Sequence, residues 1–151
     1  MVLKLKYFFD KPGEKQNFNF DISLPELEGY KNITFVSPVA ISGTLENRTG
    51  IVSVSFCVQA CLKHVCDRCL DEFERRYSFD FRHMLVRSLS GENDDYIVCE
   101  NDELDISELA VSDLLLQLPS KILCRDDCKG LCYICGKNLN FSDCSCREKQ
   151  P

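Results

Sequence analysis

The chain has 151 residues, of which 11 are cysteines, and a formal net charge of −6. This length suits one domain, and no stretch reaches the ~18 uninterrupted apolar residues that a membrane span requires. Lys4 and Lys6 interrupt the apolar start of the chain, so no export signal is evident and we expect a cytoplasmic protein. In a reducing compartment clustered cysteines are more often metal ligands than disulfides, and an odd number cannot pair completely.

Alternation of apolar and polar residues predicts a mostly antiparallel β-sheet, or a partly open barrel, in the first two thirds of the chain. The clearest example is residues 51–64, which pair with residues 39–45 across a predicted hairpin loop at 46–50. Alternation resumes after Cys69, which predicts a return strand that turns at a cysteine pair. The expected strands are residues 2–9, 17–22, 39–45, 51–64, 73–83 and 96–99.

One covering helix is predicted at about residues 106–118, where Asp105 and Glu108 form a capping box and Pro119 ends the helix. It lies in the segment 91–118, which holds nine acidic and no basic residues. We expect the acidic residues to form a solvated loop and the start of the helix. The fold class is thus α+β, with a β-rich body at 1–118.

The C-terminal tail, residues 119–151, has too few apolar residues for a core of its own, so we expect a metal to stabilise it. Structural zinc takes four ligands. In the tail, Cys132-Tyr-Ile-Cys135-Gly136 has the form of a zinc knuckle, because glycine lets the backbone turn its amides toward the thiolates. The predicted ligands are Cys66, Cys69, Cys124, Cys128, Cys132, Cys135, Cys144 and Cys146.

Two arrangements of these ligands are open. The favoured one has two zinc ions. Its local site consists of Cys132, Cys135, Cys144 and Cys146, and its long-range site of Cys66, Cys69, Cys124 and Cys128, which would clamp the tail to the turn at 66–69. The other has one ion, held by Cys128, Cys132, Cys135 and either Cys144 or Cys146, because the one-residue spacing of the last pair can strain simultaneous ligation. No role is assigned to Cys57, Cys61 and Cys99.

An enzyme is not the expected function, and we predict no catalytic residues and no small-molecule substrate. A zinc enzyme needs an open coordination site, and neither His64 nor His83 belongs to a catalytic zinc motif. A thiol-disulfide oxidoreductase would place a Cys-x-x-Cys pair where a strand of a βαβ unit meets its helix, and neither pair lies there.

Basic residues near the cysteines favour a nucleic-acid-binding module. The candidate contacts are Arg68, Arg75, Arg76, Arg125, Lys129, Lys137 and Arg147. Tyr77, Phe79 and Phe81 could stack on bases, but aromatic residues on one face of an amphipathic strand are more often core. The alternative is a protein-binding adaptor, in which the acidic segment 91–118 docks onto a basic partner.

Three segments together resemble the bacterial YceD family, the large ribosomal RNA subunit accumulation proteins. They are Cys66-Asp-Arg-Cys-Leu-Asp-Glu-Phe73, Leu-Gln-Leu-Pro119, and Cys124-Arg-Asp-Asp-Cys-Lys-Gly-Leu-Cys-Tyr-Ile-Cys-Gly-Lys-Asn-Leu-Asn140 with the two cysteines that follow. The resemblance runs from about the first hairpin to Cys146 and includes all eight predicted ligands. It implies a role without catalysis in the accumulation or processing of large-subunit ribosomal RNA in the bacterial cytoplasm. The implied partners are that RNA or its precursor, a large-subunit ribosomal protein, or both.

Overall fold

The computed structural model describes residues 1–30, 33–89, 91 and 95–146. A sheet in the order β2-β4-β5-β6-β7, with β3 also paired to β5, forms the body. All its pairings are antiparallel except that of β6 with β7, which confirms the mostly antiparallel sheet. The strands are β1 (Val2–Lys4), β2 (Lys15–Ile22), β3 (Thr34–Phe35), β4 (Val39–Arg48), β5 (Ile51–Val65), β6 (Glu72–Val86), β7 (Tyr96–Val98) and β8 (Glu103–Asp105). The helices are α1 (Lys6–Asp10), α2 (Leu24–Leu27) and α3 (Ile106–Gln117), with a 3₁₀ turn η1 at Glu100–Asp102.

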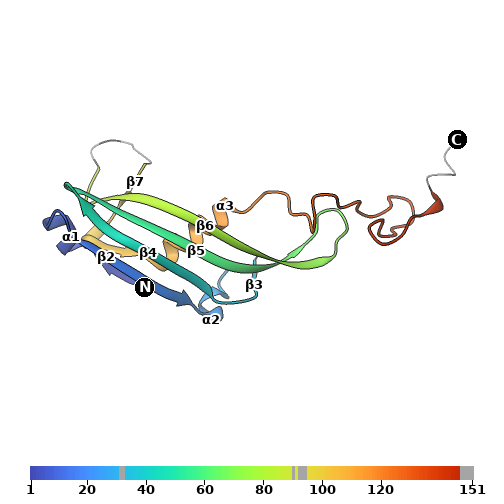
Figure 1. The fold of residues 1–151 in the computed structure, drawn as a ribbon, viewed down its shortest axis with the longest axis horizontal. Helices are drawn as coiled ribbons and strands as arrows, with labels where there is room; N and C mark the ends of the chain where they lie inside the picture. The colour runs from blue at the N-terminus through green and yellow to red at the C-terminus, as the bar shows by residue number, and fades with distance from the viewer. Residues whose placement is uncertain (31–32, 90, 92–94, 147–151) are drawn as a thin grey trace.

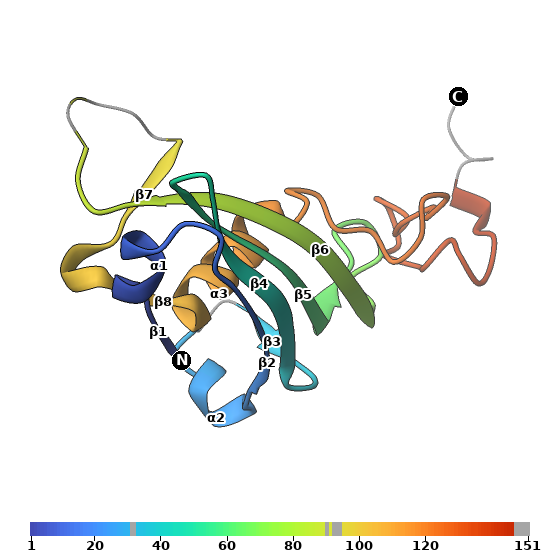
Figure 2. The same ribbon diagram turned by 60° about the vertical axis from the view of Figure 1, so that its left-hand side comes forward.

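The predicted alternation in β5 separates two faces of the sheet. Its apolar residues, from Val52 to Leu62, are buried, whereas Gln59 and Lys63 on the other face are exposed. The sheet curls, and α3 lies against its concave side (Figures 1 and 2). We call the opposite, convex side the outer face of the sheet.

Residues 2–9 do not form the single strand that was predicted. The strand ends at Lys4, where β1 pairs with β8, and α1 follows at Lys6. Leu5 and Phe8 are both buried and lie three residues apart, which is helical spacing. Tyr7, which a strand would place on the same face as Leu5, is half exposed instead.

The first hairpin is tighter than predicted. Its strands continue through the expected loop to Arg48 and Ile51, and the turn consists of Thr49 and Gly50. Both turn residues have positive φ angles, of 53° and 92°, as the twist of a two-residue hairpin requires. The buried Asn47 side chain accepts the Gly50 N–H at 2.8 Å and donates to the carbonyl of Phe8 at 2.6 Å, which joins the turn to α1.

α3 begins and ends close to the predicted residues. The Asp105 side chain accepts the backbone N–H groups of Ser107 and Glu108. Asp113 of the helix contacts His83 of β6 at 2.6 Å, which joins helix and sheet. The strand aromatics Tyr77, Phe79 and Phe81 are partly buried and pack against the hydrophobic core, which confirms the core interpretation.

Beyond α3 the chain runs past the turn between β5 and β6 and extends away from the sheet, so that the cysteine-rich tail lies at one end of an elongated molecule (Figure 1). Within the residues that the structure describes, no helix is long and apolar enough to cross a lipid bilayer.

Candidate metal centres

The eight predicted ligands gather in two groups of four sulfur atoms, and within each group the Sγ atoms lie within 4.8 Å of one another. The inner site, beside the sheet, consists of Cys66, Cys69, Cys124 and Cys128, and the outer site consists of Cys132, Cys135, Cys144 and Cys146. This is the grouping expected for two ions. The one-ion set is divided between the two sites, because Cys128 and Cys132 belong to different groups.

The sulfur separations in the inner site match tetrahedral coordination. Cys66 and Cys128 have their Sγ atoms 3.7 Å apart, and so do Cys69 and Cys124. A Zn–S bond of ~2.3 Å gives tetrahedral edges of about 3.8 Å, whereas a disulfide requires about 2.05 Å. Four soft thiolate donors in this arrangement are the ligand set that zinc prefers in closed structural sites. The residues present therefore fit a zinc ion.

Each site is built on the same backbone turn. In the outer site the Gly136 N–H donates to the Cys132 carbonyl, and the Cys132 N–H donates to the Lys137 carbonyl, both at 2.8 Å. In the inner site the Leu70 N–H donates to the Cys66 carbonyl at 3.0 Å, and the Cys66 N–H donates to the Asp71 carbonyl at 2.9 Å. The inner turn therefore has the same knuckle form as the outer one.

The residue after the second cysteine of each knuckle has a left-handed backbone. Gly136 has a φ of 73°, as glycine readily adopts, but the equivalent Leu70 has a φ of 60°. A side chain in this conformation costs roughly 1–2 kcal/mol. Leu70 is 62% exposed, so burial of its side chain does not offset this free-energy cost. The inner knuckle thus holds a strained backbone that the metal site and the flanking strands β5 and β6 must stabilise.

Polar contacts fasten the tail to the inner knuckle. The Asp67 N–H donates to the carbonyl of Ile122 at 2.8 Å, and the Ile122 N–H donates to the Asp67 carboxylate at 2.6 Å. The Leu131 N–H donates to the carbonyl of Arg68 at 3.2 Å. Gly130 lies so close that an added Cβ would be 3.0 Å from the same Arg68 carbonyl oxygen. The tail thus contacts the knuckle backbone both before its first inner ligand, Cys124, and after its second, Cys128.

Asparagine side chains connect the two sites. Asn140 lies between ligands of the outer site, but its Nδ2 donates to the Cys128 sulfur of the inner site at 3.3 Å. Its Oδ1 accepts the Lys129 N–H at 2.8 Å and the Arg125 guanidinium at 2.9 Å. Asn138 donates to the Asp71 carboxylate at 2.8 Å. These amides hold the outer segment in place beside the inner site.

The electrostatics of both sites favour a bound cation. Burial opposes ionisation of the Cys66 thiol, but backbone N–H groups, two of them in its own turn, lower its pKa to about 6. Two backbone N–H groups of its knuckle likewise lower the pKa of Cys132 to about 6. The Asp71 N–H lowers the pKa of Cys69, but burial and the neighbouring thiols outweigh it and raise that pKa to about 12. Neighbouring thiols and burial also raise the pKa of Cys146 to about 12. A divalent cation would supply the charge that lets all four thiols of a site ionise.

The predicted nucleic-acid contacts lie in different surroundings. The Arg68 guanidinium donates to the Cys128 carbonyl at 3.0 Å, and that of Arg75 donates to the Leu123 carbonyl at 2.6 Å. Both therefore support the inner site. Arg125 forms its contacts within the tail, and the Lys137 ammonium donates to the backbone carbonyl of Asp143 at 3.3 Å. The Lys129 side chain is exposed, and Arg147 lies outside the described residues.

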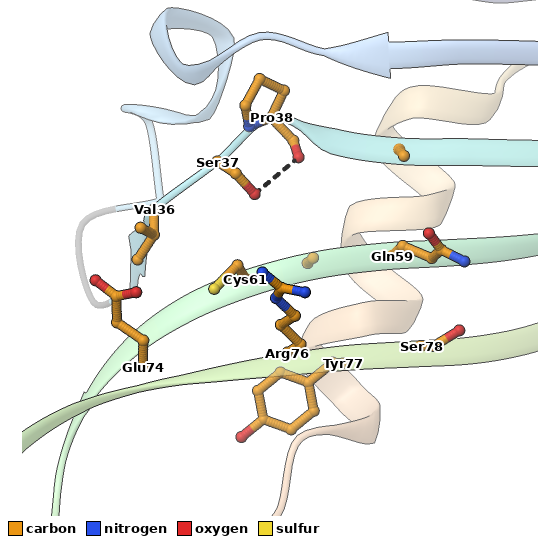
Figure 3. A pocket seen from close by; sticks show the side chains of 11 residues that line it. Val36, Ser37, Pro38, Gln59, Cys61, Glu74, Arg76, Tyr77 and Ser78 are labelled. Atoms are coloured by element: carbon orange, nitrogen blue, oxygen red, sulfur yellow. Dashed lines mark hydrogen bonds between the residues drawn. The ribbon is translucent and has the colours of Figure 1, made fainter.

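Arg76 lies apart from both four-cysteine sites, in a groove of about 550 Å³ on the outer face of the sheet (Figure 3). The groove opens where residues 36–38 lead from β3 to β4, and Arg76 is opposite Cys61 on the neighbouring strand. Gln59 of β5 and Ser78 of β6 are the next pair of opposed residues on this face, and both also line the groove. With the described residues, the Arg76 guanidinium makes no ion pair or hydrogen bond.

The remaining cysteines and the histidines lie outside both sites. Cys57 and Cys61 are partly exposed on β5, and Cys99 is buried beside the core. His64 contacts the Tyr77 hydroxyl at 3.0 Å. Burial, and then the nearby Arg75, lower the pKa of His64.

A comparison with known protein families matches the region that holds both sites. The family model described as "Large ribosomal RNA subunit accumulation protein YceD" matches residues 54–151, from within β5 to the end of the chain, and so includes all eight clustered cysteines. "Uncharacterized protein YlbN" of Bacillus subtilis (strain 168) is 26% identical in an alignment 118 residues long, and the alignment covers 75% of this chain and 69% of YlbN. No solved structure matches the chain.

Proposed function

Because the chain belongs to the YceD family of large ribosomal RNA subunit accumulation proteins, we propose that it supports the accumulation of large-subunit ribosomal RNA as a zinc-binding assembly factor without catalytic activity. It acts in the cytoplasm, where a reducing environment keeps its thiols available as ligands. Its partner is large-subunit ribosomal RNA or the precursor of that RNA.

The observation that carries the proposal is the pair of four-sulfur sites within the matched region. A site closed by four thiolates leaves no open position for a substrate or a reactive water, so its role is structural. Zinc in the inner site would hold the tail against the turn between β5 and β6, and zinc in the outer site would hold the end of the tail. The result is a rigid binding element that projects from the sheet.

The cations support contact with RNA unevenly. Arg68 and Arg75 are occupied by backbone carbonyls, whereas Arg76 and Lys129 are exposed. Arg76 has a matched control in Arg82, which is exposed on the same face of β6 but outside the groove. Arg76→Ala should weaken binding to precursor RNA. It should also reduce the slope of log K against log salt concentration by the amount that corresponds to about one phosphate contact. Arg82→Ala should change neither the affinity nor the slope.

The adaptor remains a second candidate, because residues 91–118 carry nine acidic and no basic side chains. However, several of these acids already have partners within the chain. Asp102 pairs with Arg87 at 2.6 Å, Asp113 pairs with His83, and Asp105 caps α3. This leaves less negative charge for a basic protein than the sequence alone indicates.

The test is removal of the chain from cells that produce it, followed by measurement of large-subunit relative to small-subunit ribosomal RNA. The ratio should fall, and the intact chain should restore it, whereas Cys128→Ser should not. An unchanged ratio would refute the proposed function. Crosslinking in growing cells then separates the two candidates, because crosslinks to large-subunit RNA support the RNA-binding factor and crosslinks to ribosomal protein alone support the adaptor.

A further inference from the structure

Large apolar side chains are exposed on the loops of the outer site. Tyr133 is 72% exposed, Ile134 is 53% exposed and Phe141 is 80% exposed. Tyr133 and Ile134 lie between the ligands Cys132 and Cys135, and Phe141 lies in the segment before the next ligand. Burying such side chains is favourable by roughly 1.5–3 kcal/mol each, so their exposure together on one small element marks a contact surface.

Hydrogen bonds hold the backbone of these loops in place. The Gly136 N–H donates to the Cys132 carbonyl, and the Cys132 N–H donates to the Lys137 carbonyl, both at 2.8 Å. The turn before Phe141 is held by Asn138, whose side-chain oxygen accepts the Asn140 N–H at 3.0 Å. The aromatic rings therefore project from a preorganised frame, which lowers the entropic cost of binding a partner.

The charges around these rings fit RNA better than a basic protein. Residues 128–142 contain the cations Lys129 and Lys137 and no acidic residue, and the nearest acidic residues along the chain are Asp127 and Asp143, just beyond the two ends of this segment. Lys137 donates to a neutral backbone carbonyl, so its positive charge is not neutralised there. Exposed aromatic rings beside cations are the usual means of binding single-stranded nucleic acid, because every base has a face on which a ring can stack. A basic ribosomal protein would find carboxylates only at the two ends of this segment, at Asp127 and Asp143.

We propose that the loops of the outer site bind unpaired nucleotides of RNA, with Tyr133 and Phe141 as stacking platforms and Lys129 and Lys137 beside the phosphates. This inference rests on the proposed function and names one surface that contributes to it, separate from the groove around Arg76. Four thiolates around one divalent ion leave a net negative charge, which the lysines offset. Stacking therefore supplies most of the affinity, and the salt dependence is shallow, with a slope of at most about −1.4 for two phosphate contacts on a single strand.

The test uses the full zinc-loaded chain and a fluorescein-labelled oligoadenylate of about 12 nucleotides, the length that a small single-strand site covers. Tyr133→Ala and Phe141→Ala should each raise the Kd about 5- to 150-fold, which corresponds to the loss of one stacked base. Tyr133→Phe should keep the affinity of the original chain. Leu116→Ala is the matched control, because Leu116 is 85% exposed on α3, and it should leave the Kd unchanged.

A fluorescent reporter makes stacking visible directly. The chain has no tryptophan, so Tyr133→Trp introduces a single indole at the proposed platform. Adding the oligoadenylate should quench its fluorescence, whereas the indole of a Leu116→Trp variant should not respond. Metal analysis of each variant should show the same zinc content as the original chain, because none of the changed residues is a ligand.

Unchanged affinity in Tyr133→Ala and Phe141→Ala, no binding of the oligoadenylate at all, or an equal loss in Leu116→Ala would each overturn the inference. The proposed function fails separately, if removal of the chain from cells leaves the ribosomal RNA ratio unchanged even though the loops bind RNA. If the double variant with Tyr133→Ala and Phe141→Ala loses RNA binding, retains zinc and fails to restore the ratio, the inference and the function both hold.

Discussion

The inner and outer sites use the same knuckle but differ in what they connect. In the inner site Cys66 and Cys128 are 62 residues apart in the sequence, whereas all four ligands of the outer site come from residues 132–146. The inner thiols are mostly buried, while Cys135 of the outer site is exposed. A metal in the inner site closes a long loop and fixes tertiary structure, whereas a metal in the outer site orders only a short segment. The difference suggests that the inner site positions the tail and the outer site presents its loops.

The largest effect should come from removing one inner ligand. We expect Cys128→Ser to lose one zinc ion and to release the tail from the turn between β5 and β6, because binding of about 10–16 kcal/mol per structural zinc is coupled to folding. The Asp67 N–H, which donates to Ile122, should then exchange rapidly with deuterium. Cys135→Ser should also lose one ion but keep the Asp67 N–H protected. The measurements are zinc content and hydrogen exchange.

Cys57→Ser is the control for this pair, because Cys57 is partly exposed on β5 and belongs to neither site. It should retain both ions. If Cys135→Ser exposes the Asp67 N–H as fully as Cys128→Ser does, the two sites do not have separate roles.

The second effect tests how the sites are connected. Asn140→Ala removes the donor to the Cys128 sulfur and the acceptor for the Lys129 N–H. Loss of such a supporting contact typically lowers metal affinity ~10- to 100-fold, and we expect that decrease at the inner site alone. Competition with a chelator of known affinity measures it. Asn19→Ala, at an exposed position of β2, should have no effect, and an equal decrease at both sites would contradict this assignment.

A third comparison concerns the glycines of the tail. Gly130 has a φ of 74°, and a Cβ added to it would make a tight contact of 3.0 Å with the Arg68 carbonyl oxygen, whereas Gly136 has a φ of 73° and open space around it. Gly130→Ala should therefore lower the free energy of unfolding by roughly 2–3 kcal/mol, and Gly136→Ala by roughly 1–2 kcal/mol. Denaturant unfolding of the zinc-loaded variants measures both values. Equal losses in the two variants would show that the close approach of Gly130 to Arg68 adds no cost to a side chain at this position.

The smallest effect should be a gain. Leu70→Gly relieves the left-handed leucine of the inner knuckle, which costs roughly 1–2 kcal/mol, but it adds roughly 0.5–1 kcal/mol of backbone entropy to the unfolded chain. We expect a net stabilisation of about 0.5 kcal/mol in denaturant unfolding. A clear loss of stability would mean that the Leu70 side chain makes contacts that outweigh its backbone strain.

The grouping of the eight cysteines could be predicted from the sequence, because a structural zinc ion takes four ligands. Four thiolates per ion divide eight clustered cysteines into two sets. The knuckle that begins at Cys132 could be recognised because glycine, at Gly136, follows its second cysteine. The equivalence of the inner knuckle was missed, since leucine rarely adopts the left-handed conformation that Leu70 has. The matching spacing from Cys66 to Asp71 and from Cys132 to Lys137 was the available signal.

Other features could not be predicted, because they depend on contacts between distant segments. The contacts of Arg68 and Arg75 with backbone carbonyls are one example, because a guanidinium donates to a carbonyl as readily as to a phosphate, and only the fold shows which acceptor is near. The link from Asn140 to Cys128 is of the same kind. At the N-terminus, alternation at Leu3 and Leu5 predicted a continuing strand, whereas burial of Phe8 favoured α1.

The most direct test of this account is the metal content of the full chain, purified from cells without oxygen or chelator, with hydrogen exchange of the tail measured before and after metal removal. We predict two zinc ions per chain, and loss of protection at the Asp67 and Leu131 N–H groups when the zinc is removed. A chain that contains no metal and still protects both groups would contradict the account.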